Sequence, residues 1–321
     1  MEYDFDEYGE SMRIVFAGTP GFSVPCLTAL LEADDIDVVG VVSQPDRKSG
    51  RGMKLTPSAV KQAALDAGID VITPEKLRDN DEALTWLESK QADILVVVAF
   101  GMILPKTWLD APSIAAVNVH ASLLPRWRGA APIERALLAG DKQTGVCIMQ
   151  MEEGLDTGGV YARTILPISN QTTGSELWFK LSPMGAELLI DTLPAIATGL
   201  LPAPQTADGQ TYAKKISNDE RIIDWTLSAS AIDRLVRCFS PRPGVRTQCQ
   251  GKWLKLIAGE ALPSSHQTSP GSIIATDHGL DIACSNGSIY RINTLQAEGK
   301  KAMPAIDFLR GAQLNAGDSL A

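Results

Sequence analysis

Short, almost wholly apolar runs alternate with helix-like stretches through the amino-terminal half of the chain. The apolar runs comprise residues 13–17, 38–43, 71–73, 94–99 and 115–119, and the helix-like stretches between them comprise residues 23–32, 57–67 and 81–90. Strands that are apolar on both faces and alternate with helices are typical of a parallel sheet covered by helices on each side. The pattern therefore predicts an α/β fold with a mostly parallel sheet.

The pattern changes after about residue 200. Two further strands, 145–151 and 160–167, lead into a long helical stretch at 173–201, which is followed by the linker-like run L-P-A-P-Q-T-A-D-G-Q-T. Beyond this run, a helix precedes five short β-rich segments, and these elements comprise residues 228–239, 245–249, 253–258, 271–275, 280–284 and 288–295. Short strands at this spacing favour a small barrel of the oligonucleotide-binding type. We therefore predict an α/β domain over 12–200, a linker over 201–216 and a barrel domain over 217–315.

Length and charge limit the possible partners of the chain. With 321 residues, of which 45% are hydrophobic, it can bury the cores of two domains. A formal net charge of −9 argues against a protein that coats nucleic acid non-specifically, because such binding depends on many lysines and arginines. Any polyanionic partner is expected to meet a local basic patch.

Several features favour a reducing, cytoplasmic setting. The five cysteines are scattered and form no C-x-x-C pair, so we expect neither a disulfide framework nor a metal site. Residues 1–11 are acidic and lack Arg, unlike a secretory or mitochondrial signal, and we expect a disordered extension there, with Met12 as an alternative start. No strong exposed apolar stripe stands out, which favours a monomer.

Three residues could carry chemistry at the edge of the predicted sheet. His120 ends the run A-V-N-V-H, where a parallel strand should reach the ligand-binding edge, whereas His266 and His278 lie in polar turns. Asn118 projects to the same face as His120, because side chains alternate along a strand. A hydrogen-bonded polar pair that closes the strand is the alternative interpretation. Asp156, in the loop M-E-E-G-L-D-T-G-G, is the candidate acid, although an Asp in such a loop is usually a turn former.

A basic segment stands out in this acidic chain. The run Q-P-D-R-K-S-G-R-G-M-K at 44–54 contains Arg47, Lys48, Arg51 and Lys54 around two glycines. It is either a solvated flexible loop or a mobile arm that embraces phosphates. The same alternatives apply to the lysine pair Lys214 and Lys215.

Common signatures of other enzymes are absent from the sequence. The turn after the first strand lacks G-x-G-x-x-G, and neither a phosphate-binding G-x-x-x-x-G-K-[ST] motif nor a G-x-S-x-G elbow occurs. No serine or cysteine lies in a recognisable nucleophile setting, and Cys147 is expected in the core. The sequence therefore offers no recognisable nucleophile for a covalent mechanism.

Three segments resemble the folate-dependent formyltransferases. They are M-R-I-V-F-A-G-T-P at 12–20, N-V-H-A-S-L-L-P-R-W-R-G-A-A-P-I at 118–133 and E-E-G-L-D-T-G at 152–158. The basic segment at 44–54, R-I-I-D-W at 221–225 and G-K-K-A-M at 299–303 resemble the branch that formylates methionine on initiator tRNA. Gly21 departs from the family, which often has an acidic residue at this position.

The resemblance implies a fold, a reaction and a set of residues. It implies a Rossmann-like domain followed by an oligonucleotide-binding barrel, with 10-formyltetrahydrofolate and methionyl initiator tRNA as substrates. The implied catalytic residues are Asn118, His120 and Asp156. The implied folate contacts are Ser122, Leu123, Leu124, Pro125, Phe100, Gly101, Ile103 and Leu104, and the expected tRNA contacts are Arg47, Lys48, Arg51, Lys54, Lys214 and Lys215. The alternatives are a formyltransferase that acts on a small amine, such as an amino-sugar nucleotide or glycinamide ribotide, and a non-catalytic RNA-binding module.

Overall fold

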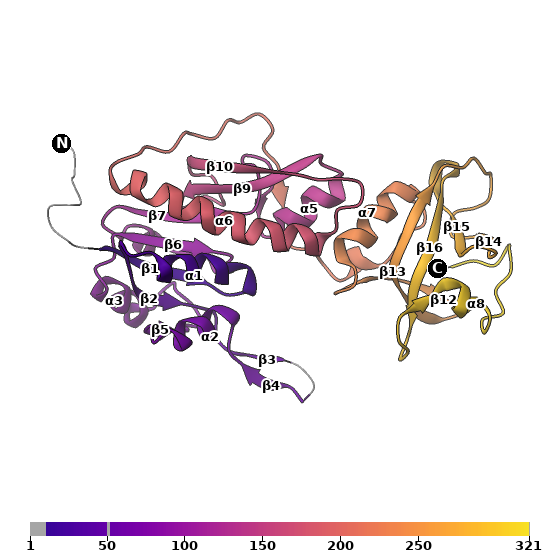
Figure 1. Ribbon diagram of the computed structural model, residues 1–321, viewed down its shortest axis with the longest axis horizontal. Coiled ribbons are helices and arrows are strands. Elements are labelled where there is room, and N and C mark those ends of the chain that lie inside the picture. Colours follow the sequence, from indigo (N-terminus) through magenta and orange to yellow (C-terminus); the bar gives the residue numbers. More distant parts are fainter. Residues whose placement is uncertain (1–10, 50–51, 321) are drawn as a thin grey trace. The chain divides into compact units, whose positions relative to one another are not determined.

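The computed structural model describes residues 11–49 and 52–320, and their backbone divides into two compact units (Figure 1). Unit 1 comprises the residues up to Pro132 together with Gln143–Pro167 and Trp178–Lys214. Unit 2 comprises Ile133–Lys142, Ile168–Leu177 and the residues from Lys215 onward. Arg51 and residues 1–10 of the expected extension lie outside the described residues.

Unit 1 is built on a seven-stranded sheet with the order β10-β9-β7-β6-β1-β2-β5. Strands β5, β2, β1, β6 and β7 are parallel, whereas β9 is antiparallel to both β7 and β10. The prediction of a mostly parallel, Rossmann-like sheet is thus confirmed. The strands span Met12–Gly18 (β1), Ile36–Val42 (β2), Val71–Ile72 (β5), Ile94–Val98 (β6), Ala115–His120 (β7), Gln143–Gln150 (β9) and Val160–Pro167 (β10).

Helices cover the sheet because its strands are apolar on both faces. On one face, helix α6 (Gly174–Ala197) comes so close that a Cβ at Gly185 would lie 2.9 Å from Val119 Cγ1. On the other face, a buried cluster around Val97, Ala116 and Trp108 includes residues of α3 and α4. The remaining helices of unit 1 are α1 (Val24–Glu32), α2 (Ala59–Asp66), α3 (Asp81–Ser89) and α4 (Lys106–Leu109).

The basic segment forms a β-hairpin in its described part. Strands β3 (Arg47–Ser49) and β4 (Lys54–Thr56) are antiparallel, and Lys48 is paired with Leu55. The side chains of Arg47, Lys48 and Lys54 are exposed. The hairpin therefore presents these cations to solvent.

Unit 2 is an antiparallel sheet with a helix packed against it. The strand order is β12-β13-β16-β15-β14, with β17 added beside β16, and helix α7 packs against β13 and β16. No pairing joins β12 to β14 among the described residues, so the sheet is a curled half-barrel, in agreement with the predicted small barrel. The elements span Pro132–Ala139 (α5), Ala229–Phe239 (α7), Val245–Cys249 (β12), Lys252–Leu262 (β13), Ile273–Ala275 (β14), Leu280–Ala283 (β15), Ile289–Ala297 (β16), Met303–Pro304 (β17) and Ala305–Leu309 (α8).

The sequence reasoning missed helix α5 and the short elements α4, α8 and β17. None of the described helices is both long enough and apolar enough to cross a membrane.

Candidate active site at the end of strand β7

Two polar side chains lie near the carboxyl end of strand β7. Asn118 and His120 lie on the face opposite to Val119 and are only 9% and 5% exposed. Their strand is central, with β6 on one side and β9 on the other. Because buried polar groups are costly unless they are hydrogen-bonded, both side chains need partners at this position.

Asp156 supplies a partner to each of these side chains. Its Oδ1 lies 3.5 Å from Asn118 Nδ2, and its Oδ2 lies 3.7 Å from His120 Nδ1. The backbone N–H of Gly129 donates to Oδ2 over 2.7 Å. Asp156 has a positive φ of 51°, which few non-glycine residues adopt, so the surrounding contacts must hold this conformation. The structure therefore brings together the three residues that the sequence suggested.

The backbone, and not Asp156, determines which nitrogen of His120 holds a proton. His120 Nε2 lies 2.9 Å from the carbonyl oxygen of Trp127, and because a carbonyl only accepts, Nε2 must carry the hydrogen. Nδ1 is then the nitrogen that faces Asp156 and can exchange a proton. Trp127 is itself held by a hydrogen bond from its N–H to Thr211 Oγ1.

Two short strands fix the segment that contains this carbonyl. Strand β8 (Arg128–Gly129) pairs in parallel with β11 (Tyr212–Ala213). The segment that holds the Trp127 carbonyl therefore depends on residues that lie more than eighty positions further along the chain. Sequence reasoning missed this pairing, because two-residue strands leave no periodic pattern.

Gln205 fastens the loop that carries Asp156. Its side-chain Nε2 donates to the carbonyls of Asp156 and Gly158 over 2.9 and 2.7 Å. Its Oε1 accepts from Nε and Nη2 of buried Arg128 over 3.0 and 2.8 Å. Every polar group of this amide is thus used to join the loop to the segment after β7. Gln205 was also missed, because in sequence it is one polar residue in a linker-like run.

We expect Gln205→Glu to lower kcat by about ten- to a hundredfold, with smaller changes in the KM of either substrate. A carboxylate still accepts from Arg128, but it cannot donate to the two carbonyls, so the loop loses its hold on Asp156. Steady-state kinetics measure the split between kcat and KM. The matched control is Gln210→Glu, since half-buried Gln210 lies in the same segment and donates to the hydroxyl of Tyr212 rather than to the loop of Asp156. Equal kcat values for the two variants would contradict this role.

The residues expected to contact folate divide into exposed and buried groups. Ile103 is 85% exposed, Gly101 is exposed, and Leu123 and Pro125 are half-buried, so these four can touch a bound molecule directly. The side chains of Phe100, Leu104, Ser122 and Leu124 are buried. The Ser122 hydroxyl donates to the carbonyl of Arg126 over 2.7 Å, so this side chain supports the loop from within.

Neighbouring groups hold the segment that presents Ile103. The Phe100 carbonyl accepts hydrogen bonds of 2.9 Å from both Thr19 Oγ1 and Gln44 Nε2. Gly101 has a φ of +79°, and a Cβ there would lie 2.5 Å from Gln44 Nε2. The segment is therefore positioned before any ligand arrives, as preformed small-molecule sites usually are.

The expected tRNA contacts are solvent-facing where the structure describes them. Arg47, Lys48 and Lys54 lie on the β3–β4 hairpin, and Lys214 and Lys215 are exposed. Arg47 also donates to Gln44 Oε1, the same amide that holds Phe100.

The cysteines are unsuited to nucleophilic chemistry. All five are buried, and burial raises the pKa of each thiol, to about 12 for Cys26 and about 11 for Cys284. Cys147 therefore stays a neutral thiol in the core. Within residues 11–49 and 52–320, no group of three or more His, Cys, Asp or Glu side chains could hold a metal ion.

Comparisons with known proteins agree with this architecture. Residues 12–193 match the family model described as formyl transferase, and residues 215–313 match the model described as formyl transferase, C-terminal domain. The chain therefore belongs to the formyltransferase family.

Curated relatives that cover nearly the whole chain are named methionyl-tRNA formyltransferase, which indicates the branch of the family. The relative from Xanthomonas axonopodis pv. citri is 48% identical, with 93% of this chain and 97% of the relative covered. The relative from Chromobacterium violaceum is 44% identical, with coverage of 96% and 99%. The chain is a member of the methionyl-tRNA formyltransferases, which confirms the resemblance seen in the sequence.

Solved structures share the fold at lower identity. An N-formyltransferase from Helicobacter canadensis, in complex with folinic acid and dTDP-3-aminofucose, gives a TM-score of 0.64 at 18% identity, covering 89% of this chain and 99% of that one. HypX from Aquifex aeolicus, in complex with tetrahydrofolic acid, gives 0.58 at 17% identity over 97% of this chain, which spans 51% of HypX.

Proposed function

We propose that this chain transfers the formyl group of 10-formyltetrahydrofolate to the free amino group of methionine on initiator tRNA, giving N-formylmethionyl-tRNA for translation initiation. The convergence of Asn118, His120 and Asp156 at the end of β7 carries this proposal. The near full-length similarity to methionyl-tRNA formyltransferases supports the choice of acceptor.

The reaction exchanges one carbon–nitrogen bond for another. The neutral amine of methionine attacks the formyl carbon, and the formyl oxygen becomes negative in the tetrahedral intermediate. The bond to N10 of the folate then breaks as the proton of the attacking nitrogen is delivered to N10. The protein must stabilise the oxyanion and move one proton.

The three residues are suited to these two tasks. In our proposal, Asn118 Nδ2 donates to the oxyanion, and His120 Nδ1 donates to it when the ring carries a proton on both nitrogens. Each such donor contributes about 3 kcal/mol to lowering the barrier. The 3.5 Å separation of Asn118 Nδ2 from Asp156 is long for a hydrogen bond, which leaves the amide able to turn toward a substrate. Asp156 accepts the proton of the attacking amine and orients His120, while the Trp127 carbonyl holds the far side of the ring.

A formyltransferase that acts on a small amine is the rival function. The Helicobacter canadensis structure bears such an acceptor in its name, dTDP-3-aminofucose, but that chain is only 18% identical to this one. The relatives at 44–48% identity favour the tRNA acceptor.

Incubation of the purified chain with methionyl initiator tRNA and 10-formyltetrahydrofolate tests the proposal. After hydrolysis of the ester, mass analysis should find N-formylmethionine in place of methionine. Parallel reactions should contain glycinamide ribotide or an amino-sugar nucleotide. Efficient formylation of a small amine, with methionyl-tRNA left unmodified, would favour the rival function.

We expect the β3–β4 hairpin to contact the tRNA phosphates. Lys48→Ser combined with Lys54→Ser should raise the KM for tRNA about tenfold and reduce the slope of log affinity against log salt by about two, because two phosphate contacts are lost. These changes leave the Arg47–Gln44 contact in place. Filter-binding titrations over a range of salt concentrations measure the slope. Lys76→Ser with Arg78→Ser removes two exposed cations elsewhere in unit 1 and should leave the slope nearly unchanged. An equal effect of the two double substitutions would mean that the hairpin is solvated and does not contact the tRNA phosphates.

We also propose that the protein works in the cytoplasm as a monomer. Light scattering at micromolar concentration should give the mass of a single chain, and a dimer mass would overturn this part of the proposal.

A further inference from the structure

Three segments meet at one carbonyl group at the carboxyl edge of the main sheet. Thr19, Gln44 and Phe100 follow strands β1, β2 and β6, which are neighbours in the sheet with β1 in the centre. Because parallel strands end at the same edge, the segments that follow them can reach each other across β1. Thr19 Oγ1 and Gln44 Nε2 both donate to the Phe100 carbonyl over 2.9 Å. The backbone at Phe100 is thus held by two hydrogen bonds.

The segment after β6 needs this support. Ala99 and Gly101 have positive φ angles of 45° and 79°. Such a conformation is costly at alanine and persists only where surrounding contacts hold it. The Phe100 side chain is buried in the core, and the two hydrogen bonds fix its carbonyl. Loss of either bond therefore allows the segment that presents Ile103 to relax.

The amide of Gln44 holds this carbonyl in only one of its two orientations. Its Oε1 accepts from Arg47 Nη2, while its Nε2 donates to the Phe100 carbonyl. An arginine only donates and a carbonyl only accepts, so these partners fix which end of the amide faces which. In the flipped orientation two oxygens would face each other at Phe100, and the hydrogen bond would be lost. Gln44 is only 9% exposed, so Arg47 rather than bulk water determines its orientation.

Arg47 connects this amide to the basic hairpin. It begins β3, where it pairs with Thr56 of β4, and its side chain is exposed. An exposed arginine loses rotamer freedom when it is fixed, so its bond to Gln44 competes with other rotamers in the absence of a ligand. A guanidinium has five N–H donors in a planar fork, so it can bind a phosphate while one N–H stays on Gln44. A bound phosphate would therefore fix Arg47 in the position that orients the amide.

We propose that Gln44 is a positioning residue that couples the two substrates: an RNA phosphate on Arg47 fixes the Gln44 amide, and the amide holds the segment that receives folate. The held conformation exists before any ligand binds, and RNA increases its population. By thermodynamic reciprocity, folate must raise the affinity for RNA by the same factor. The identity of the two ligands rests on the proposed function, whereas the chain of contacts between them does not.

The coupling is measured with two ligands that cannot react with each other, tetrahydrofolate and uncharged initiator tRNA. The full-length chain is titrated with tetrahydrofolate in the absence and in the presence of saturating tRNA, and the ratio of the two Kd values is the coupling factor. We expect tRNA to lower the Kd about fivefold. A wild-type factor below about twofold would overturn the proposal.

Gln44→Met and Thr19→Val form a matched pair. Each removes one hydrogen bond to the Phe100 carbonyl, so both should weaken tetrahydrofolate binding about threefold in the absence of tRNA. Gln44 is also bonded to Arg47, so the coupling factor should fall to about one in Gln44→Met and stay near fivefold in Thr19→Val. A merely structural role would lower the affinity in both variants and leave both factors alike. Equal coupling factors in the two variants would therefore overturn the role of Gln44.

Arg47→Met tests the same link from the hairpin. It changes an exposed side chain and leaves Gln44 itself in place, so the test survives if thermal unfolding shows that Gln44→Met is unstable. Its coupling factor should also fall to about one. A factor that stays near the wild-type value would contradict the proposal.

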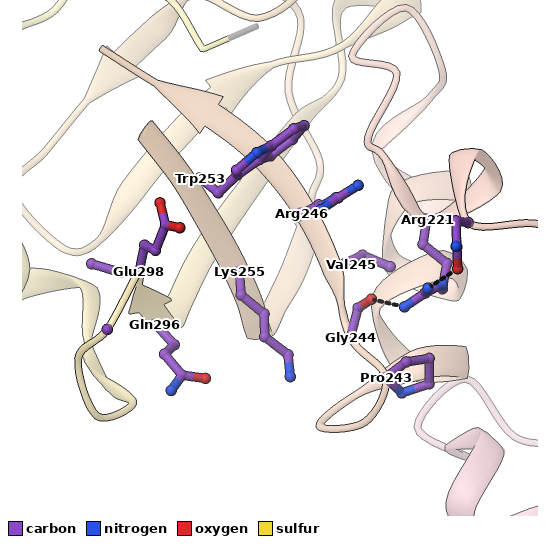
Figure 2. Close-up of a pocket in the computed structure, with 12 residues that line it drawn as sticks. Arg221, Pro243, Gly244, Val245, Arg246, Trp253, Lys255, Gln296 and Glu298 are labelled. Atoms are coloured by element: carbon purple, nitrogen blue, oxygen red, sulfur yellow. Dashed lines mark hydrogen bonds between the residues drawn. The ribbon is translucent and has the colours of Figure 1, made fainter. Parts of the chain in front are cut away.

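Lys255→Met is the control for the loss of one positive charge. Lys255 lines a pocket whose lining residues all belong to unit 2 (Figure 2), whereas Arg47, Gln44 and Phe100 belong to unit 1. The coupling factor of Lys255→Met at saturating tRNA should remain near fivefold. Loss of coupling in Lys255→Met as well as in Arg47→Met would show that a general loss of positive charge is responsible, and would overturn the proposal.

Failure of the coupling differs from failure of the proposed function. A chain that formylates methionyl-tRNA with a wild-type coupling factor of about one contradicts only the coupling. A chain that shows the coupling but forms no N-formylmethionine contradicts only the reaction. A chain that binds no tRNA contradicts both.

Discussion

His120→Ala should lower kcat by about two to three orders of magnitude, the effect typical of removing one donor to an oxyanion. In the folded chain the Trp127 carbonyl holds Nε2–H, so Nδ1 is directed at Asp156 and the position we propose for the formyl oxygen. Alanine removes both the donor and the group that Asp156 orients. The KM for each substrate should change little, because the lost interaction belongs to the transition state. Single-turnover formylation under saturating substrates measures the effect on the chemical step.

The control for this variant is His266→Ala. His266 also uses both ring nitrogens, with Nε2 2.9 Å from the Ser288 carbonyl and Nδ1 accepting from the Thr268 N–H. Loss of a hydrogen-bonded histidine is thus common to both variants, but only His120 lies at the proposed site. Turnover by His120→Ala close to that of His266→Ala would refute the assignment.

The second large effect on kcat is expected from Gly158→Ala, which adds a methyl group that touches no substrate. A Cβ at Gly158 would lie 2.0 Å from the carbonyl oxygen of Gln150, which is backbone at the end of β9 and cannot rotate away. Gly158→Ala must therefore shift the loop that carries Asp156. A displacement of about 1 Å at a catalytic group can cost a hundredfold, and we expect a loss of that order in kcat.

Gly154→Ala is the matched control in the same loop. The three atoms nearest to a Cβ there all belong to the side chain of Thr157, namely Oγ1 at 2.1 Å, Cγ2 at 2.9 Å and Cβ at 3.0 Å. Rotation of this side chain about χ1 relieves the shortest contact. We expect Gly154→Ala to retain kcat within about threefold, since the backbone of the loop need not move. Equal kcat values in the two alanine variants would show that the position of this loop does not govern the reaction.

The local sequence pattern predicted which strand residues share the face of the candidate site. The apolar run of β6 and the alternation in β7 placed Asn118 and His120 on one face, because the period of a strand is two residues. The same logic could not bring Asp156 to them, since the path of an irregular loop depends on contacts far away in the sequence. Here those contacts are the amide of Gln205 and the N–H of Gly129.

The register between paired strands could not be predicted from the sequence either. The β-rich segments of unit 2 were predicted near their observed positions, but no property of a single strand states which residue faces which across a ladder. The opposition of Arg246 and Lys255 is visible only once β12 and β13 are paired. Likewise, the exposed cations of 44–54 predicted a basic surface, and the pairing of β3 with β4 needed coordinates.

The hydrogen bonds of Gln205 and the pairing of β8 with β11 limit how far this enzyme could be shortened. A fragment ending with helix α6 would keep all seven strands of the main sheet, yet its aspartate loop would be untethered and its imidazole unsupported. We therefore expect a minimal catalyst to run through Ala213. In a chimera that recruits another acceptor, the exchangeable cassette should begin after that residue.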